Sequence, residues 1–485
     1  MGPFCEGVPG RLVGERGSRV DERPDTQPHP DIRLPWSRSD RPVPRRVLRP
    51  LQEFLSTSTA SGTLLLFAAL AALAWANSPW GSVYEDLWST PLELSFGDWV
   101  IGEDLRHWVN DGLMTLFFLV VGLEIKREFL TGELQEWRAA ALPVVAAIGG
   151  MLVPALIYLA FNSGDAGVRG WGIPMATDIA FALGVLLLAA RHAPSALKPF
   201  ILTLAIVDDI GAILVIAVFY SEGIALGSLL AAAAVCVLML VLRRVGIKAT
   251  YVFVGLGVIV WLATYTSGVH PTIAGVVLGL LAPAAPFQRP HAVSEEARRT
   301  ADLTVDDPDP PDADASHWLR LAGLSREAVS PLARTEHALL PWTSFWIVPL
   351  FAFANAGVPL SGEQIANALS SPVTLGVFLG LVIGKVAGIS GAAALALSTR
   401  FARLPAGVGF PHITGAAAVA GIGFTVSLLM AELAFEDRAL IDEAKVGILA
   451  ASVIAGAIGW VLLRVAPPVD EESLPDHEGG RFDDV

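Results

Sequence analysis

Two adjacent acidic residues, Asp208 and Asp209, lie inside the apolar stretch 200–219, which is long enough to cross a membrane. The stretch contains no basic residue. Because ionised carboxylates are costly at membrane depth, a segment that carries two of them indicates an ion or proton pathway rather than a simple anchor. The alternative is a structural pair whose charges are satisfied by neighbouring helices.

A single basic residue, Lys385, lies near the middle of another apolar segment, residues 373–398. A buried ammonium group needs a carboxylate partner, and the acids at comparable depth are Asp208, Asp209 and Asp178. Neighbouring residues of a helix point in directions about 100° apart, so the two adjacent aspartates cannot share one face. We therefore expect one of them to face Lys385 and the other to face an aqueous cavity.

The composition supports a membrane setting for these charges. Of all residues, 53% are hydrophobic and only 16% are charged, whereas an ordinary soluble domain has roughly a quarter charged residues. The net charge of −14 comes from acids outside the apolar segments, mainly in residues 291–330 and 467–485. It describes solvated loops and a tail, and indicates no nucleic-acid partner.

The apolar segments define the expected architecture and its boundaries. Residues 1–47 lack the apolar core of a signal peptide and predict a disordered cytoplasmic N-terminal extension. Residues 48–466 form the predicted membrane domain, which includes an acidic cytoplasmic loop at 288–330, and residues 467–485 form an acidic cytoplasmic tail. Twelve apolar segments predict an all-α polytopic membrane protein: 61–77, 109–127, 140–161, 174–190, 198–220, 224–242, 251–266, 270–284, 338–358, 373–398, 413–434 and 443–464.

The basic residues of the short loops predict the orientation. Lys and Arg in such loops stay on the cytoplasmic side of a membrane. Counted through the twelve segments, nearly all of them fall on one side, for example Arg45, Arg243 and Arg464. Both termini are therefore expected to be cytoplasmic.

Two of the apolar segments are interrupted. Pro174 removes a backbone donor near the start of one segment, and Thr177 and Asp178 bring polar groups into it. The other contains Gly421-Ile-Gly-Phe-Thr in its middle. Irregular backbone at membrane depth is tolerated only where it is buried in protein or lines a cavity, so the two interruptions indicate a site.

Several long motifs resemble the NhaA family of sodium/proton antiporters over residues 48–466: Ala176-Thr-Asp-Ile-Ala-Phe-Ala-Leu-Gly, Leu204-Ala-Ile-Val-Asp-Asp-Ile-Gly-Ala-Ile, Ser267-Gly-Val-His, Pro349-Leu-Phe-Ala-Phe-Ala-Asn-Ala-Gly-Val and Gly421-Ile-Gly-Phe-Thr. The resemblance implies about twelve transmembrane helices with inverted repeats and two crossing discontinuous helices. It also implies an electrogenic Na⁺(Li⁺)/H⁺ antiporter of the bacterial inner membrane that exports sodium and regulates intracellular pH and sodium. Such a protein is a secondary active transporter, not an enzyme, and has no cofactor besides the transported ions.

The resemblance also assigns roles to the buried polar residues. Asp209 becomes the main carboxylate that binds Na⁺, Li⁺ or protons, and Asp208 its companion, paired with Lys385. Thr177 and Asp178 belong to the crossing, where Asp178 offsets the positive ends of the half-helices and Lys385 the negative ends. Carboxylate oxygens suit a hard cation, and protons compete with the cation for them.

A second polar cluster lies at the predicted cytoplasmic end of the segment 109–127. Its first three members are spaced so that they share a helix face, and the resemblance adds two residues and a role in pH sensing: Glu124, Arg127, Glu128, Glu336 and His337. The alternative is an ordinary interfacial salt-bridge network. Leu340 and Ala333 stand where the best-known family member has a histidine and a lysine, so the pH set-point stays open.

An external hairpin is expected between the first two segments. Residues 92–96, a turn at Gly97-Asp98, and residues 99–101 carry its pattern. In the family such a hairpin supports a homodimer, so we expect one here, in contact with membrane lipid.

Other protein classes can also use buried charges. An intramembrane aspartyl protease needs two acids that share a proton and usually come from separate elements, whereas Asp208 and Asp209 are adjacent. A sodium-coupled solute symporter would also use broken helices, but the motifs show no aromatic pocket for a solute. A scaffold without transport would have no use for the buried charges.

Overall fold

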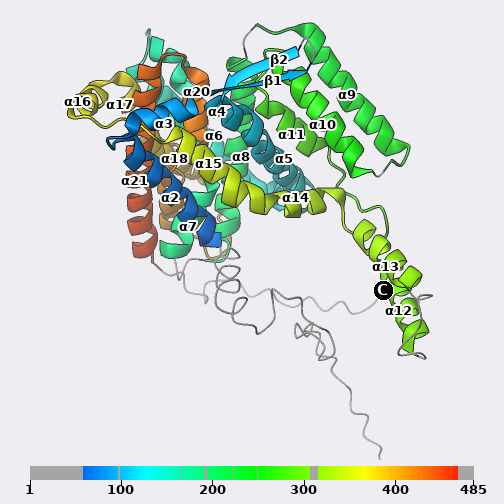
Figure 1. The fold of residues 1–485 in the computed structure, drawn as a ribbon. Helices are drawn as coiled ribbons and strands as arrows, with labels where there is room; N and C mark the ends of the chain where they lie inside the picture. Colours follow the sequence, from blue (N-terminus) through cyan, green and yellow to red (C-terminus); the bar gives the residue numbers. More distant parts are fainter. Residues whose placement is uncertain are drawn as a thin grey trace, which may run out of the picture. The chain divides into compact units, whose positions relative to one another are not determined.

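The computed structural model describes residues 58–96, 99–164, 166–189, 194–221, 223–247, 249–305 and 315–467. The predicted N-terminal extension, and the tail from residue 468 onward, lie outside the described residues. The described chain is almost entirely helical, with one short hairpin (Figure 1). This agrees with a polytopic helical membrane protein.

The first half of the chain contains the hairpin and the helices up to the acidic insert. Its elements are α2 (Ser58–Ala76), α3 (Gly81–Trp88), β1 (Pro91–Phe96), β2 (Trp99–Asp104), α4 (Leu105–His107), η3 (Trp108–Leu113), α5 (Met114–Thr131), η4 (Glu133–Gln135), α6 (Trp137–Phe161), η5 (Ala166–Met175), α7 (Ile179–Ala189), α8 (Leu197–Phe219), α9 (Leu226–Arg244), α10 (Thr250–Tyr265) and α11 (Thr272–Leu281).

The second half begins with the insert and ends with a long terminal helix. Its elements are α12 (Pro290–Val305), α13 (Ala315–Ala328), α14 (Pro331–Trp342), η7 (Thr343–Ile347), α15 (Val348–Asn355), α16 (Gly362–Ser370), α17 (Pro372–Leu379), η8 (Gly380–Gly384), α18 (Lys385–Ser398), α19 (Phe410–Val419), α20 (Phe424–Ala434) and α21 (Arg438–Val465).

Every predicted apolar segment coincides with helical structure, but not every such helix is long enough to cross a membrane alone. Within the described ranges, seven helices are long and apolar enough to cross a membrane alone, and up to ten spans result if each bent helix pair counts as one. The helices α10 and α11 are apolar but shorter. An integral membrane protein with several spanning helices is therefore shown, and the count of twelve stays a prediction.

Both predicted interruptions are real bends. The axes of η5 and α7 differ by 45°, and those of α19 and α20 by 48°. Glycine is required at the second bend because the backbones approach closely. A Cβ atom on Gly423 would lie 3.1 Å from the carbonyl oxygen of Ala176, and one on Gly421 would lie 2.6 Å from that of Leu381. The relation of these helices as crossing members of inverted repeats stays a prediction.

Glycines also bring two pairs of helices together around the bends. A Cβ atom on Gly149 of α6 would lie 2.3 Å from the carbonyl oxygen of Gly388 in α18, and the reverse substitution would give 2.2 Å. In the same way, Gly275 of α11 faces the Thr115 carbonyl of α5. Small residues at such positions let helices pack by backbone contact, which is common between membrane helices.

The surface away from this core is apolar. Along α9, Leu226 and Leu230 are 64% and 60% exposed, and in the neighbouring α10, Tyr251 and Val254 are 80% and 61% exposed. Figure 1 shows these two helices side by side. A continuous apolar surface of this kind is unstable in water and fits contact with lipid.

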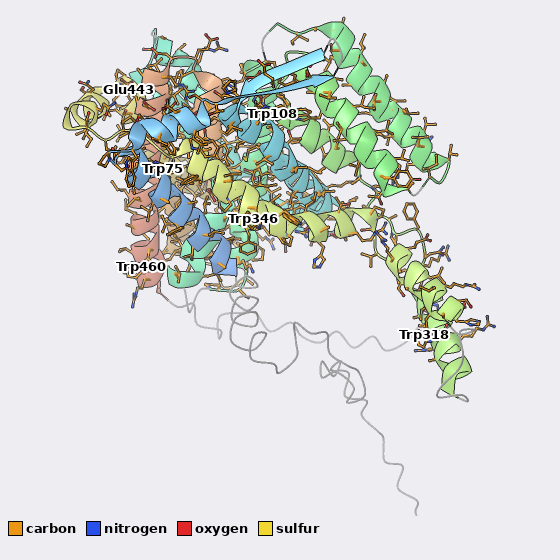
Figure 2. The ribbon with its side chains drawn as sticks, in the orientation of Figure 1. Trp75, Trp108, Trp318, Trp346, Glu443 and Trp460 are labelled. Atoms are coloured by element: carbon orange, nitrogen blue, oxygen red, sulfur yellow. The ribbon has the colours of Figure 1, made fainter. Side chains whose placement is uncertain are left out.

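The predicted hairpin is confirmed. Strands β1 and β2 pair antiparallel from Pro91 opposite Asp104 to Phe96 opposite Trp99, although the turn residues themselves lie outside the described part. Trp75, labelled in Figure 2, lies on α2 and packs edge-on against Tyr84 with ring centroids 5.8 Å apart. This contact joins α2 to α3, which bends away from it by 116°.

The acidic insert differs from the expected loop. Much of residues 288–330 is helical, in α12 and α13, which pack against each other. The acids occur in a sequence that also has good helix formers such as Ala, Arg and Leu. Composition identified the insert as solvated but missed its secondary structure.

Candidate functional site

The central ion pair is fully buried. The Lys385 Nζ atom lies 2.6 Å from Asp208 Oδ2, and both side chains have no exposed surface. Asp208 comes from the middle of α8, and Lys385 from the first turn of α18. The pairing expected from the sequence is therefore present. Removing either partner would leave the other charge buried and uncompensated.

Thr177 connects this ion pair to the first helix break. Its hydroxyl oxygen lies 2.8 Å from Asp208 Oδ2 and 2.9 Å from the carbonyl oxygen of Ala420, so it can donate to either. It also accepts a hydrogen bond of 3.0 Å from Lys385 Nζ. Residues 176–178 between η5 and α7, and Ala420 at the end of α19, thus meet at one hydroxyl group.

Asp178 holds the beginnings of two helices. Its Oδ2 atom accepts hydrogen bonds from the backbone N–H and the hydroxyl of Thr425, at 3.1 and 2.7 Å, and its Oδ1 atom accepts one from the Phe181 N–H at 3.1 Å. These donors lie in the first turns of α20 and α7. A carboxylate satisfies free N–H groups at helix starts and offsets the positive end of the helix dipole. This is the geometry that the family resemblance implies for Asp178.

The opposite helix end faces Lys385. Its Nζ atom donates a 2.5 Å hydrogen bond to the carbonyl oxygen of Met175, the last residue of η5. The backbone N–H of Asp178 donates to the carbonyl oxygen of Ile422 at 2.6 Å, which joins the two breaks directly. The ammonium group therefore contacts the carbonyl end of one half-helix, and the compensating role that the resemblance implies for Lys385 stays a prediction.

Asp209 is the acid that this network leaves available. It is 5% exposed, and its side chain forms no hydrogen bond or ion pair within the described part of the chain. The Oδ1 atom of Asp208 also has no partner there, but its Oδ2 atom is held by Lys385 and Thr177. The charges of Asp208, Glu124, Asp178 and Lys385 act on Asp209. A buried oxygen without a partner is costly, so a proton or a cation on Asp209 would remove that cost.

The oxygen groups gathered at the two helix breaks suit a hard cation. Carboxylate, hydroxyl and carbonyl oxygens are the ligands that hard cations prefer. No group of three or more His, Cys, Asp or Glu side chains in the described ranges is placed to hold a metal ion. The arrangement can bind and release a proton or a monovalent cation.

The second predicted cluster is divided in the structure. Arg127, which is 46% exposed, forms an ion pair with Glu336. The charges of both act on Glu124. Glu128 is buried and instead accepts a 2.8 Å hydrogen bond from the Glu133 N–H, whereas His337 is exposed. Arg127, Glu336 and Glu124 therefore interact as one charged group, and Glu128 makes a separate contact. His337 belongs to neither and is exposed.

A cavity of about 450 Å³ opens beside Glu128. Its walls come from the end of α5, from η4 and from the first turns of α8, and its polar side chains include Glu133, Glu136 and Lys198. Thr203 lines it and lies six residues before Asp209, which is about 9 Å along a helix at 1.5 Å per residue. The cavity therefore adjoins both the charged end of α5 and the beginning of the helix that carries the buried acids.

Sequence reasoning missed part of the site. Thr425 stands in the Gly-Ile-Gly-Phe-Thr motif that marked the second break, but its bonds to Asp178 were not predicted. The carbonyl groups of Met175, Ala420 and Ile422 carry no signal in the sequence. Only the interruptions themselves could have indicated that backbone groups would be free to bind there.

Asn110 and Asp111 lie at the other end of the α4–η3–α5 span. The Asn355 side chain donates to Asn110 Oδ1 at 2.8 Å, and His270 Nε2 lies 3.3 Å from Asp111 Oδ1. These contacts join η3 to α15 and to the residues before α11.

Known proteins resemble this chain over most of its length. A family profile described as Na⁺/H⁺ antiporter 1 matches residues 52–463. The Na(+)/H(+) antiporter NhaA of Oleidesulfovibrio alaskensis is 46% identical over 87% of this chain and 94% of its own length. The Na(+)/H(+) antiporter NhaA 2 of Sorangium cellulosum is 46% identical over 88% and 92%, and that of Myxococcus xanthus 44% over 89% and 93%. The chain therefore belongs to the NhaA family of Na⁺/H⁺ antiporters.

Proposed function

We propose that this protein exchanges Na⁺ or Li⁺ for protons electrogenically across a bacterial inner membrane, with Asp208 and Asp209 at the transport site. One observation carries the proposal. Of two adjacent buried aspartates beside two helix breaks, Asp208 is paired with Lys385, whereas the Asp209 side chain forms no ion pair or hydrogen bond within the described part of the chain. Family membership supports antiport, and the geometry supports these residues as its site.

Competition for Asp209 couples the two ions. A proton and a sodium ion cannot occupy the same carboxylate oxygens together, so loading one expels the other. Alternating access then carries the protonated form in one direction and the sodium form in the other. Net export of sodium follows when protons enter down their electrochemical gradient.

The buried ion pair supplies a second protonatable group. Electrogenic exchange requires that more protons than sodium ions cross the membrane in a cycle. The Asp208–Lys385 pair lies next to Asp209 and is buried, so a proton gained or lost by it would change the charge of the moving site. Thr177 would keep Asp208 oriented while Lys385 changes partners.

The remaining features complete the proposal. The basic residues of the short loops support an orientation with both termini in the cytoplasm, and the cavity beside Glu128 would then be the cytoplasmic entrance. The Arg127–Glu336 pair, with Glu124, Glu128 and His337 near it, would respond to pH at that entrance. The hairpin β1–β2 would join two copies as a homodimer. The transported ions are the only small ligands, and no resident cofactor is part of the proposal.

Sodium-induced proton efflux from acid-loaded everted vesicles tests the proposal. Fluorescence dequenching after addition of Na⁺ or Li⁺ is measured for the wild type and for Asp209→Asn, which keeps size and polarity but removes the charge. Asp302→Asn is the matched control, because Asp302 is exposed on α12. We expect dequenching in the wild type and the control and none in Asp209→Asn. If neither cation moves protons in the wild type at any pH, antiport is wrong and a sodium-coupled symporter becomes the leading alternative.

A further inference from the structure

A second buried ion pair lies outside the site described above. The Lys445 Nζ atom of α21 is 2.6 Å from Glu432 Oε1 of α20, and the two side chains are 3% and 11% exposed. Neither residue contacts Asp208, Asp209 or Lys385 through a hydrogen bond or ion pair in the described part of the chain. Glu432 lies in the last turn of α20, the helix that begins at the second break, and Lys445 lies near the start of α21.

Further charges surround this pair. Arg106 of α4 is 3% exposed and donates two hydrogen bonds to the Glu85 carboxylate of α3, at 3.0 and 2.8 Å. The charges of Arg106 and Arg438 act on Glu432 together with that of Lys445. The helix α4 begins the span Leu105–Thr131, and Arg127 lies near the end of that span. The charged group around Arg106 is therefore at the end of the span away from Arg127.

The other charged neighbours on α21 are engaged differently. Asp442 feels the charges of Lys445, Glu85, Glu432 and Arg438. Glu443, labelled in Figure 2, accepts a 2.6 Å hydrogen bond from the Ser371 hydroxyl at the start of α17. Lys445 is therefore the cation on α21 that reaches α20.

Stability alone is a weak reason for such a pair. Burying two charges costs desolvation energy, and an apolar pair of the same volume often stabilises a protein as well or better. An ion pair is directional: it favours one rotation of the helix about its axis and one position along that axis. Breaking it by removing one partner leaves an uncompensated charge.

Direction matters here because α20 has few directional contacts. Apart from Glu432, its polar side chains are Thr425, bonded to Asp178, and Ser427, whose hydroxyl donates to the Ile173 carbonyl at 2.7 Å. The remaining side chains are apolar, so their contacts have no preferred direction. Thr425 and Glu432 are seven residues apart, which puts them on one face, about 10 Å apart along the axis.

We propose that Lys445 is a positioning residue for the ion site: by holding Glu432 it fixes the rotation and height of α20, which keeps Thr425 on Asp178. This rests on the proposed function. A shift of about 1 Å at Thr425 is enough to break a hydrogen bond of ordinary length. Without that bond Asp178 no longer holds the two helix starts in register beside Asp209.

Two measurements on purified full-length protein test the proposal. The apparent KM for Na⁺ and the maximal rate are measured in proteoliposomes, and hydrogen exchange of the backbone N–H groups at the start of α20 is followed by mass spectrometry. The variants are Lys445→Met, the apolar pair Glu432→Leu with Lys445→Met, and the charge swap Glu432→Lys with Lys445→Glu. Arg320→Met is the control, because it removes an ion pair of 3.5 Å on the exposed face of α13.

We expect a rise in apparent KM and faster exchange in the variants that lack the ion pair. The KM should rise by about three- to tenfold in Lys445→Met and in the apolar pair, the value of one lost hydrogen bond. The charge swap should restore both readouts, and the control should change neither. The apolar pair keeps the test valid if Lys445→Met fails to fold, because it leaves no buried charge.

Specific outcomes overturn the proposal. If the apolar pair folds and keeps the wild-type KM and exchange rate, the ion pair has a packing role only. If exchange at the start of α20 is unchanged in every variant, Lys445 does not position Thr425, whatever transport shows. A wild type without sodium-dependent proton movement contradicts the proposed function instead, and hydrogen exchange still decides the role of Lys445.

Discussion

The buried centre and the charged end of α5 contain similar residue types but use them differently. At the centre, Thr177, Asp208 and Lys385 come from three distant segments and converge on one another with no exposed surface on the ion pair. At the end of α5, Arg127 and Glu128 are neighbours in sequence but face different partners. Proximity in sequence was therefore a poorer guide to contact than the need of a buried charge for a partner.

Burial explains the difference. A charge in the apolar interior must find an opposite charge or hydrogen-bond donors, which restricts the possible folds of the segments that carry it. A charge at a half-exposed helix end can be solvated instead, so several arrangements cost about the same. The predictions below test whether the contacts at the buried centre contribute more to stability than those at the end of α5.

Loss of the central ammonium group should have the largest effect. Lys385→Met leaves the Asp208 carboxylate fully buried, and removing one partner of a buried pair costs about 3–5 kcal/mol. We expect a strongly lowered midpoint in thermal unfolding of the detergent-solubilised protein. Adding Asp208→Asn to Lys385→Met should recover much of that stability, because no charge is then left unpaired. Unchanged stability and transport in Lys385→Met would show that the ion pair is unimportant.

Adding a side chain where the backbones approach closely at the second break should have the next largest effect on stability. In Gly423→Ala the new Cβ atom would lie 2.4 Å from Ser427 Oγ and 3.1 Å from the Ala176 carbonyl oxygen. The hydroxyl can rotate away but the backbone cannot, so we expect a cost of about 1–3 kcal/mol in unfolding free energy. Gly184→Ala in α7 is the matched control, since nothing lies within 4 Å of its Cβ position. Equal effects of the two substitutions would show that the breaks do not need close contact.

Removing one bond to Asp178 should cost somewhat less. Thr425→Val deletes the 2.7 Å hydroxyl bond but keeps the shape and the backbone N–H bond. We expect about 1–2 kcal/mol of destabilisation and a raised apparent KM for Na⁺. Thr414→Val is the control, because that hydroxyl only bonds within its own helix, to the Phe410 carbonyl. If Thr425→Val kept the wild-type KM for Na⁺, the bond between Thr425 and Asp178 would not contribute to the ion site.

The features that could be predicted from the sequence are those with few physical solutions. Pro174 and the glycines of the second motif marked the bends, and Lys385 had three candidate partners, of which Asp208 is the one found. Backbone carbonyls such as that of Met175 became ligands only through the fold. The helices of the acidic insert were missed because composition reports solvation, not backbone conformation.

Breaking the ion pair at the end of α5 should have the smallest effect on stability. Arg127 is 46% exposed but Glu336 only 9%, so this pair is half-buried. Gln keeps a side-chain amide that can still donate to Glu336, so we expect Arg127→Gln to cost about 1 kcal/mol, the upper end for exposed ion pairs, and to lower the midpoint of thermal unfolding only slightly. Its effect should fall instead on the pH profile of exchange, because Glu336 and Glu124 lose the cation that acts on both. Arg326→Gln, at the end of α13, is the control that removes a positive charge elsewhere. If Arg127→Gln unfolded the protein as strongly as Lys385→Met, burial would not be what separates the two regions. If it changed neither stability nor the pH profile, the pair would be an ordinary interfacial contact, and pH sensing would have to lie in other residues.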